Sequence, residues 1–142
     1  MEPYAQAPDA VRLVREAMAA FVRGDIDALV SFVHPDAEIE MVALGGATAH
    51  GPEGLRAALE RAQLGVHRPT WSTIEPIAPD AAAMVGRIQH TDERGRTSDR
   101  KAVWLSVLRG GRIWRTRVVG SLEEARAAYA ELAGGSPRSS RS

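Results

Sequence analysis

The sequence contains no cysteine, which excludes disulfide bonds, thiolate catalysis and cysteine-ligated zinc. It also lacks a surplus of either charge, because 18 lysine and arginine residues balance 18 aspartate and glutamate residues. Proteins that bind nucleic acid by displacing counterions from phosphates are normally basic. We therefore expect no nucleic-acid partner.

Long apolar runs are absent as well. No stretch approaches the roughly 20 apolar residues needed to cross a bilayer, and the first residues lack the basic and apolar regions of a secretory signal. We therefore expect no membrane partner and a cytoplasmic location. The composition that remains, 44% hydrophobic and 25% charged over 142 residues, is typical of one globular domain with its own core.

In the first part of the chain, apolar residues recur at spacings of three and four, which is typical of amphipathic helices. This spacing predicts helices over residues 9–23 and 26–33, and a third helix from residue 51 until Gly65. A serine followed three residues later by glutamate, at Ser121 and Glu124, forms a capping box that predicts a last helix up to residue 132.

Between these helices the apolar spacing becomes two, which is typical of strands. The pattern predicts strands over residues 37–44, 70–78, 82–91, 98–108 and 112–120. Helices followed by strands indicate an α+β fold in which the helices cover one face of the sheet and enclose a small-molecule pocket. We expect residues 1–8 to be an N-terminal extension, 9–133 to form the domain and 134–142 to be a disordered tail.

Four short stretches carry a resemblance to a known family. They read FVRGDIDAL at residues 21–29, HPDAEI at 34–39, HGPEGL at 50–55 and GGRI at 110–113. In this order and spacing they resemble the SnoaL-like branch of the nuclear transport factor 2-like superfamily. The resemblance implies a cone-shaped fold with three N-terminal helices over a curved, mostly antiparallel sheet, a short C-terminal helix, and an apolar pocket between the helices and the sheet.

Members that resemble this sequence include polyketide cyclases and ketosteroid isomerase. The two acids and the tyrosine that the isomerase uses fall on Met41, Trp104 and Ala17, so the resemblance excludes steroid isomerase chemistry here. By the same comparison, eight residues are expected to contact a ligand: Met41, Met84, Ile88, Trp104, Ser106, Trp114, Thr116 and Val118.

His90 is the first candidate for a catalytic base, since a neutral imidazole accepts a proton near pH 7. The alternative is a partly buried histidine bonded to a neighbouring hydroxyl. Glu40 is the second candidate if the first strand is shifted by one residue, and otherwise a solvated strand residue. The four histidines are too scattered for a metal site, and we expect neither metal nor cofactor.

Three functions remain open. The first is a cofactor-independent cyclase, isomerase or hydrolase that acts on a small apolar substrate. The second is a non-catalytic ligand-binding or dimeric accessory protein with the same pocket. The third is homodimerisation through the outer sheet face, where Val103, Leu105 and Val107 form an apolar row.

Overall fold

A computed structural model describes residues 9–41, 47–61 and 67–134 of the chain. Its elements follow in the order α1 (Asp9–Arg23), α2 (Ile26–Ser31), β1 (Val33–Met41), β2 (Ala47–His50), α3 (Gly51–Arg61), β3 (His67–Ala78), β4 (Ala81–Thr91), β5 (Thr97–Arg109), β6 (Arg112–Val119) and α4 (Leu122–Gly134). The α+β fold predicted from the sequence is confirmed. The expected extension at residues 1–8 and residues 135–142 of the expected tail lie outside the described residues, while Gly134, expected to begin the tail, is the last residue of α4.

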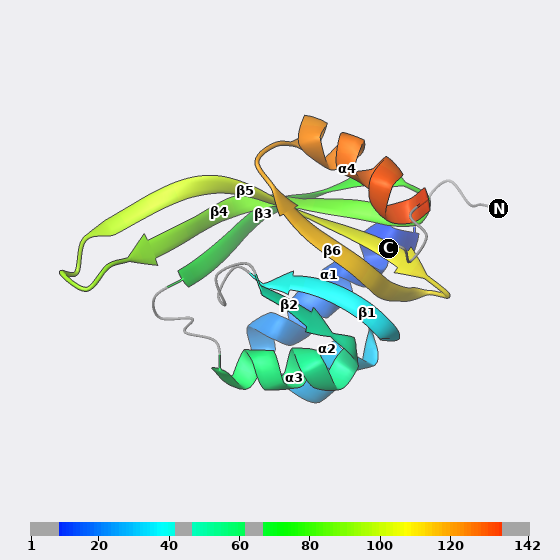
Figure 1. Cartoon of the computed structure of the whole chain (residues 1–142), viewed down its shortest axis with the longest axis horizontal. Coiled ribbons are helices and arrows are strands. Elements are labelled where there is room, and N and C mark those ends of the chain that lie inside the picture. The colour runs from blue at the N-terminus through cyan, green and yellow to red at the C-terminus, as the bar shows by residue number, and fades with distance from the viewer. Residues whose placement is uncertain (1–8, 42–46, 62–66, 135–142) are drawn as a thin grey trace.

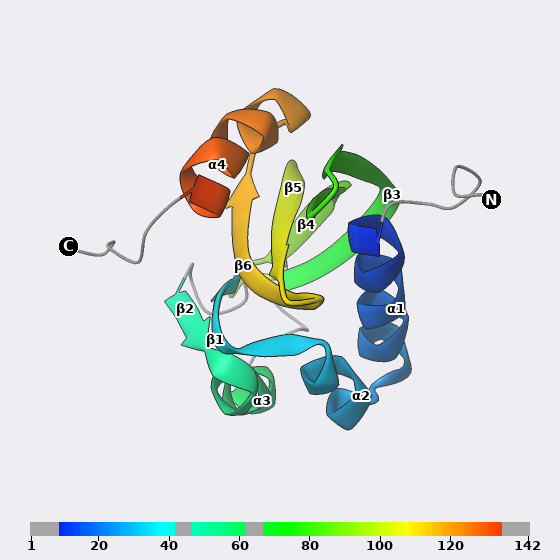
Figure 2. The same cartoon turned by 90° about the vertical axis from the view of Figure 1, so that its right-hand side faces the viewer.

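The strands form one sheet in the order β2-β1-β6-β5-β4-β3. The β1–β6 pair is parallel and the other neighbouring strands are antiparallel. The first helices lie on one side of this curved sheet and α4 lies on the other (Figures 1 and 2). The sheet therefore has two covered faces.

The sheet has one strand more than the sequence pattern indicated, because β2 was not predicted, and β1 begins earlier than expected. The predicted second helix extended to residue 33, but α2 ends at Ser31. The amide of Ile113 in β6 donates a hydrogen bond to the carbonyl of Phe32, at 2.8 Å, and Val33 pairs with Ile113. Pairing with a distant strand thus outweighs the local helical pattern.

The inner core lies between α1–α3 and the concave face of the sheet. Val14 and Ala17 of α1, Leu29 of α2, Leu55 of α3 and Met84 of β4 are buried in it. Alternation along β4 sends Ala82 and Met84 to this side and Ala81 and Ala83 to the other. The inner core is therefore the part of the fold that positions the candidate site.

The outer face of the sheet is covered by α4. Val103, Leu105 and Val107 are each at most 1% exposed, and they pack with Ala125 and Leu132 of this helix. The expectation that these three residues form an exposed face for association was wrong, because the last helix covers them. Homodimerisation stays a prediction, but this row does not supply its surface.

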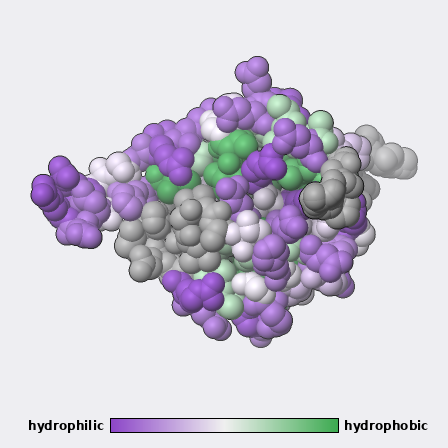
Figure 3. All heavy atoms as spheres, viewed as in Figure 1, coloured by the Kyte–Doolittle hydropathy of each residue, from purple (hydrophilic) through white to green (hydrophobic). Residues whose placement is uncertain are grey.

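The β4–β5 hairpin projects beyond the body of the molecule (Figure 1). Its end is hydrophilic on the face shown in Figure 3, and residues 93–101 are all exposed. Arg87 and Asp99 form an ion pair of 2.9 Å across the two strands. This arm lies away from the helices that cover the inner core.

Candidate functional site

A cavity of about 150 Å³ lies between the helices α1–α3 and the concave sheet face. It has the volume of an engineered cavity that binds benzene, about 150 Å³, so it has room for one ring. Its walls are mainly apolar, and every helix and strand except β2 and α4 contributes. The described lining residues are Met18, Phe21, Leu29, Val33, Ile39, Glu40, Met41, Leu55, Leu59, Pro69, Trp71, Met84, Ile88, Trp104, Ser106, Ile113 and Thr116.

Three aromatic side chains form a continuous part of this wall. Phe21 of α1 meets Trp71 of β3 edge to face, with ring centroids 5.8 Å apart, and Trp71 meets Trp104 of β5 at the same distance. Edge-to-face contacts of this kind hold rings in fixed orientations. They give the cavity a rigid, flat-sided region that suits a planar ligand.

Glu40 is the one charged side chain among the described lining residues. The pairing of β1 with β6 ends at Ile39 and Thr116, and one residue later the Glu40 side chain continues the contact between the strands. The amide of Val118 donates a hydrogen bond of 2.7 Å to Oε1 of Glu40. One carboxylate oxygen is thereby fixed by the backbone of β6, and Glu40 is one of the residues that line the cavity.

Two hydroxyl groups lie on the same wall. Ser106 of β5 and Thr116 of β6 are register partners and both line the cavity. The Glu40 amide donates a 3.0 Å hydrogen bond to Oγ1 of Thr116. Glu40, Thr116 and Ser106 therefore form one polar region in an otherwise apolar enclosure.

His90, the first base predicted from the sequence, is not among the described lining residues. It is half-buried near the end of β4, opposite Ser98, on the projecting hairpin. The structure therefore separates the two predicted bases, with Glu40 at the cavity and His90 on the arm.

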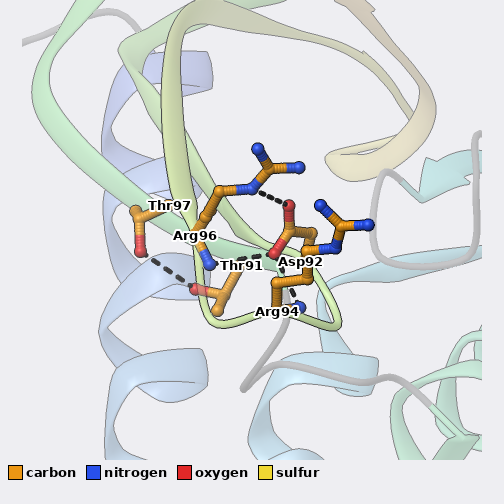
Figure 4. Close-up of polar contacts among 5 residues, drawn as sticks. All are labelled: Thr91, Asp92, Arg94, Arg96 and Thr97. Carbon is orange, nitrogen blue, oxygen red and sulfur yellow. Dashed lines mark hydrogen bonds and ion pairs between the residues drawn. The ribbon is translucent and has the colours of Figure 1, made fainter.

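The turn beside His90 is organised around Asp92 (Figure 4). Its Oδ1 accepts hydrogen bonds from the amides of Arg94 and Arg96, both at 2.9 Å, and its Oδ2 accepts one from the Arg96 guanidinium. The hydrogen bond from the Arg96 amide is the main cause that lowers the pKa of Asp92, and the bonds from the Arg94 amide and the Arg96 guanidinium add to it. Asp92 thus holds the hairpin turn and is not part of the cavity.

Six of the eight predicted ligand-contact residues lie on the cavity wall: Met41, Met84, Ile88, Trp104, Ser106 and Thr116. Val118 is half-buried and does not line the cavity, but its amide holds Glu40. Trp114 was predicted to face inward and instead packs in the outer core.

A register shift explains the position of Trp114. Leu108 pairs with Ile113, but Val107 pairs with Arg115, so β6 has one extra residue at this point. Such a bulge places two consecutive residues opposite one. Trp114 and Arg115 consequently both lie on the side of α4, where the Arg115 guanidinium carbon lies 4.1 Å from the Trp114 ring centre.

Sequence reasoning did not assign several wall residues to the site. Met18, Phe21, Leu29, Leu55 and Leu59 come from the helices, and their signal was the apolar stripe of each helix. That stripe predicts burial but does not distinguish a filled core from a cavity wall. Ile113 was not predicted to line the cavity, because the bulge reverses the inward and outward alternation along β6.

Two further observations concern the described residues as a set. They contain no group of three or more histidine, aspartate or glutamate side chains arranged to hold a metal ion. None of the helices they form has both the length and the hydropathy needed to cross a membrane.

The SnoaL-like domain family matches residues 14–116 of this chain. A search of curated proteins found no match. Among solved structures, a putative polyketide cyclase from Xanthomonas campestris is 22% identical, with a TM-score of 0.60, covering 84% of this chain and 95% of its own. TerC, co-crystallised with polyporic acid, is 23% identical with a TM-score of 0.64, covering 91% of this chain and 100% of its own.

A third solved structure is RV0760c from Mycobacterium tuberculosis in complex with estradiol-17beta-hemisuccinate. It is 18% identical, with a TM-score of 0.63, and the alignment covers 82% of this chain and 97% of that one. At these identities the structural likeness concerns the fold. The family match spans most of the chain and includes Glu40, Ser106 and Thr116, so the chain belongs to the SnoaL-like family.

Proposed function

We propose that this protein binds a small, largely apolar molecule in the cavity and that Glu40 moves a proton on it without a cofactor. The observation that carries the proposal is the position of Glu40, a single carboxylate held by the Val118 amide on an apolar wall. A general base must be fixed within reach of the proton that it removes.

The reaction we propose is a proton transfer at carbon. The Glu40 carboxylate takes a proton from a C–H bond of the ligand, and the electron pair of that bond delocalises into the ligand. The resulting carboxylic acid then returns the proton to the same carbon or to another one. Apolar walls support this chemistry because a water-poor site strengthens electrostatic interactions.

The comparisons give this proposal a chemical context. Solved structures with the same fold include a putative polyketide cyclase and a ketosteroid isomerase from Mycobacterium sp.. Two others were solved with polyporic acid and estradiol-17beta-hemisuccinate, which are small organic molecules. The fold is therefore one that accommodates such ligands, and the residues of this cavity decide which chemistry occurs in this chain.

The test is Glu40→Gln, in which the amide oxygen still accepts the Val118 hydrogen bond but no longer takes a proton. We expect exchange of deuterium from solvent into small carbon acids, followed by mass spectrometry, to fall by about 100-fold or more. Ligand binding should persist. Glu38→Gln is the matched control, because Glu38 lies two residues earlier on β1 and is exposed. Equal exchange by Glu40→Gln and wild type would refute the proposal.

One observation favours a second candidate, a non-catalytic binding protein. Among the described lining residues, Glu40 has no second titratable side chain beside it to complete an acid–base pair. The same experiment separates the two functions. A wild-type protein that is thermally stabilised by small carbon acids but exchanges none of their protons would be a binder.

A further inference from the structure

The Ser106 hydroxyl lies at the cavity and forms no hydrogen bond with another described residue. Ser106 is 5% exposed and lines the cavity. No hydrogen bond joins its Oγ to another residue that the structure describes, and this Oγ is not one of the fully buried polar atoms without a partner, so it keeps surface that a ligand can reach. A serine hydroxyl that makes no hydrogen bond to the protein has one hydrogen to donate and lone pairs to accept with. The cavity side is where a partner for Ser106 would lie.

The Thr116 hydroxyl is a second hydrogen-bond donor beside Ser106. The two residues are direct partners across β5 and β6, where facing Cβ atoms lie about 5 Å apart. The oxygen of Thr116 accepts the Glu40 amide hydrogen. A hydroxyl group that accepts one bond still has its own hydrogen to donate. Thr116 therefore has a hydrogen to offer on the wall where Ser106 also has one.

We propose that Ser106 and Thr116 bind one carbonyl oxygen of a single-ring ligand. This inference rests on the proposed function and assigns its ligand class. A carbonyl oxygen has two lone pairs and donates no hydrogen, so it matches two hydroxyl donors. The cavity volume of about 150 Å³ has room for one ring.

Glu40 fits the same ligand. Its amide donates to Thr116, the register partner of Ser106, and its carboxylate accepts from Val118 two residues further along β6, so the three polar groups lie on neighbouring positions of the sheet. Removal of a proton from the carbon beside a carbonyl group moves negative charge to that oxygen. Two fixed donors at the oxygen stabilise this charge where it develops. The negative Glu40 also disfavours ligands that carry a carboxylate or phosphate.

The pair differs from the donors of ketosteroid isomerase, whose positions fall on Ala17 and Trp104 in this chain. Ser106 lies two residues beyond Trp104 on β5, and Thr116 lies on β6. The site therefore places its hydroxyl donors on two neighbouring strands.

The decisive experiment compares acetophenone with α-methylstyrene by calorimetric titration. The two molecules have nearly the same shape, and the carbonyl oxygen of the first is replaced by a CH₂ group in the second. Wild type should bind acetophenone about tenfold more tightly or better, the factor expected for one ordinary hydrogen bond. Equal affinity for the two ligands, or no binding of acetophenone, would overturn the inference.

The variants Ser106→Ala and Thr116→Val should each reduce this preference, and Thr116→Ser should retain it. Ser98→Ala is the matched control, because Ser98 lies on the same strand in an exposed position. Full preference in both Ser106→Ala and Thr116→Val would also overturn the inference. Failure of the proposed function would give a different result, namely unchanged proton exchange in Glu40→Gln.

Discussion

At the scale of single residues, Gly86 is fixed by the backbone of the neighbouring strand. A Cβ atom at this position would lie 1.9 Å from the carbonyl oxygen of Thr70. The pairing of β3 and β4 shifts between Trp71 and Thr73, and this irregularity lies beside Gly86. Glycine is therefore the residue that lets β3 approach β4 where both form the cavity wall.

The substitution Gly86→Ala should destabilise the protein by about 3 kcal/mol or more, because backbone atoms must move to admit the methyl group. Gly54→Ala is the control, and it should increase the free energy of unfolding. In α3 the nearest atom to a new Cβ lies at 3.7 Å, and alanine favours a helix by up to about 1 kcal/mol over glycine. Urea unfolding measures both. A Gly86→Ala protein as stable as wild type would contradict the close approach of the strands.

Glu40 shows what strand alternation predicts and where it fails. Alternation placed Ile39 inside and Glu38 outside, and the structure has Ile39 buried and Glu38 exposed. The same rule placed Glu40 outside, but Glu40 lies at the end of the β1–β6 pairing and lines the cavity. A shift of the whole strand, which the sequence left open, was not needed. The residue at which β1 separates from β6 depends on contacts between residues far apart in the sequence. Glu40 and Thr116, for example, are 76 positions apart.

At the scale of elements, α4 is attached to the sheet by specific polar contacts as well as by apolar packing. The Tyr129 hydroxyl donates a 2.7 Å hydrogen bond to Asp80, at the turn between β3 and β4. The Arg115 guanidinium donates to the carbonyl of Leu132 near the end of the helix. These contacts attach α4 to the outer face at two places, the turn between β3 and β4 and the strand β6.

The bond to Asp80, with burial in addition, raises the pKa of Tyr129. A raised folded-state pKa means that the bond stabilises the protein fully below the unfolded tyrosine pKa, near 10. The stabilisation is lost as the pH rises through the higher folded value. Tyr129→Phe should cost about 1–2 kcal/mol at pH 8.

The difference in unfolding free energy between wild type and Tyr129→Phe should shrink above pH 10. Arginine and lysine residues titrate alike in both proteins, so the difference isolates Tyr129. Chemical unfolding at pH 8 and pH 11 measures it. A difference that is constant with pH would show that the hydroxyl hydrogen bond does not hold α4.

The start of α4 illustrates what the local sequence predicts. The capping box was predicted from Ser121 and Glu124, and the Glu124 amide donates to the Ser121 hydroxyl at 3.1 Å. Glu124 in turn accepts a hydrogen bond from the Gly120 amide. Both contacts involve residues within four positions, so the sequence contains them. The bulge that turns Trp114 toward α4 depends on the pairing of β5 with β6, and local spacing does not reveal it.

At the scale of the whole molecule, the fold divides the chain into two faces with different roles. The inner face is only partly filled, and it leaves a cavity with one carboxylate and two hydroxyl groups. The outer face is closed by α4 over the row of Val103, Leu105 and Val107. The fold was predicted from the sequence because helix and strand periods, together with four family stretches, extend along most of the chain.

The candidate site was less predictable, for a physical reason. A cavity is the space left after helices and strands have packed, and residue patterns report burial but not the space that remains. His90 had suitable chemistry and suitable alternation with Met84 and Ile88, yet β4 extends past the body before it reaches His90. The length of the arm, and not the type of residue, removes it from the described cavity wall.

The central claim is that proton chemistry occurs at the cavity and not at the arm. The most direct test measures deuterium exchange into one small carbon acid by wild type, Glu40→Gln and His90→Gln under the same conditions. We predict that His90→Gln keeps the wild-type rate and that Glu40→Gln loses about 100-fold or more. Loss of exchange in His90→Gln with full activity in Glu40→Gln would contradict the account.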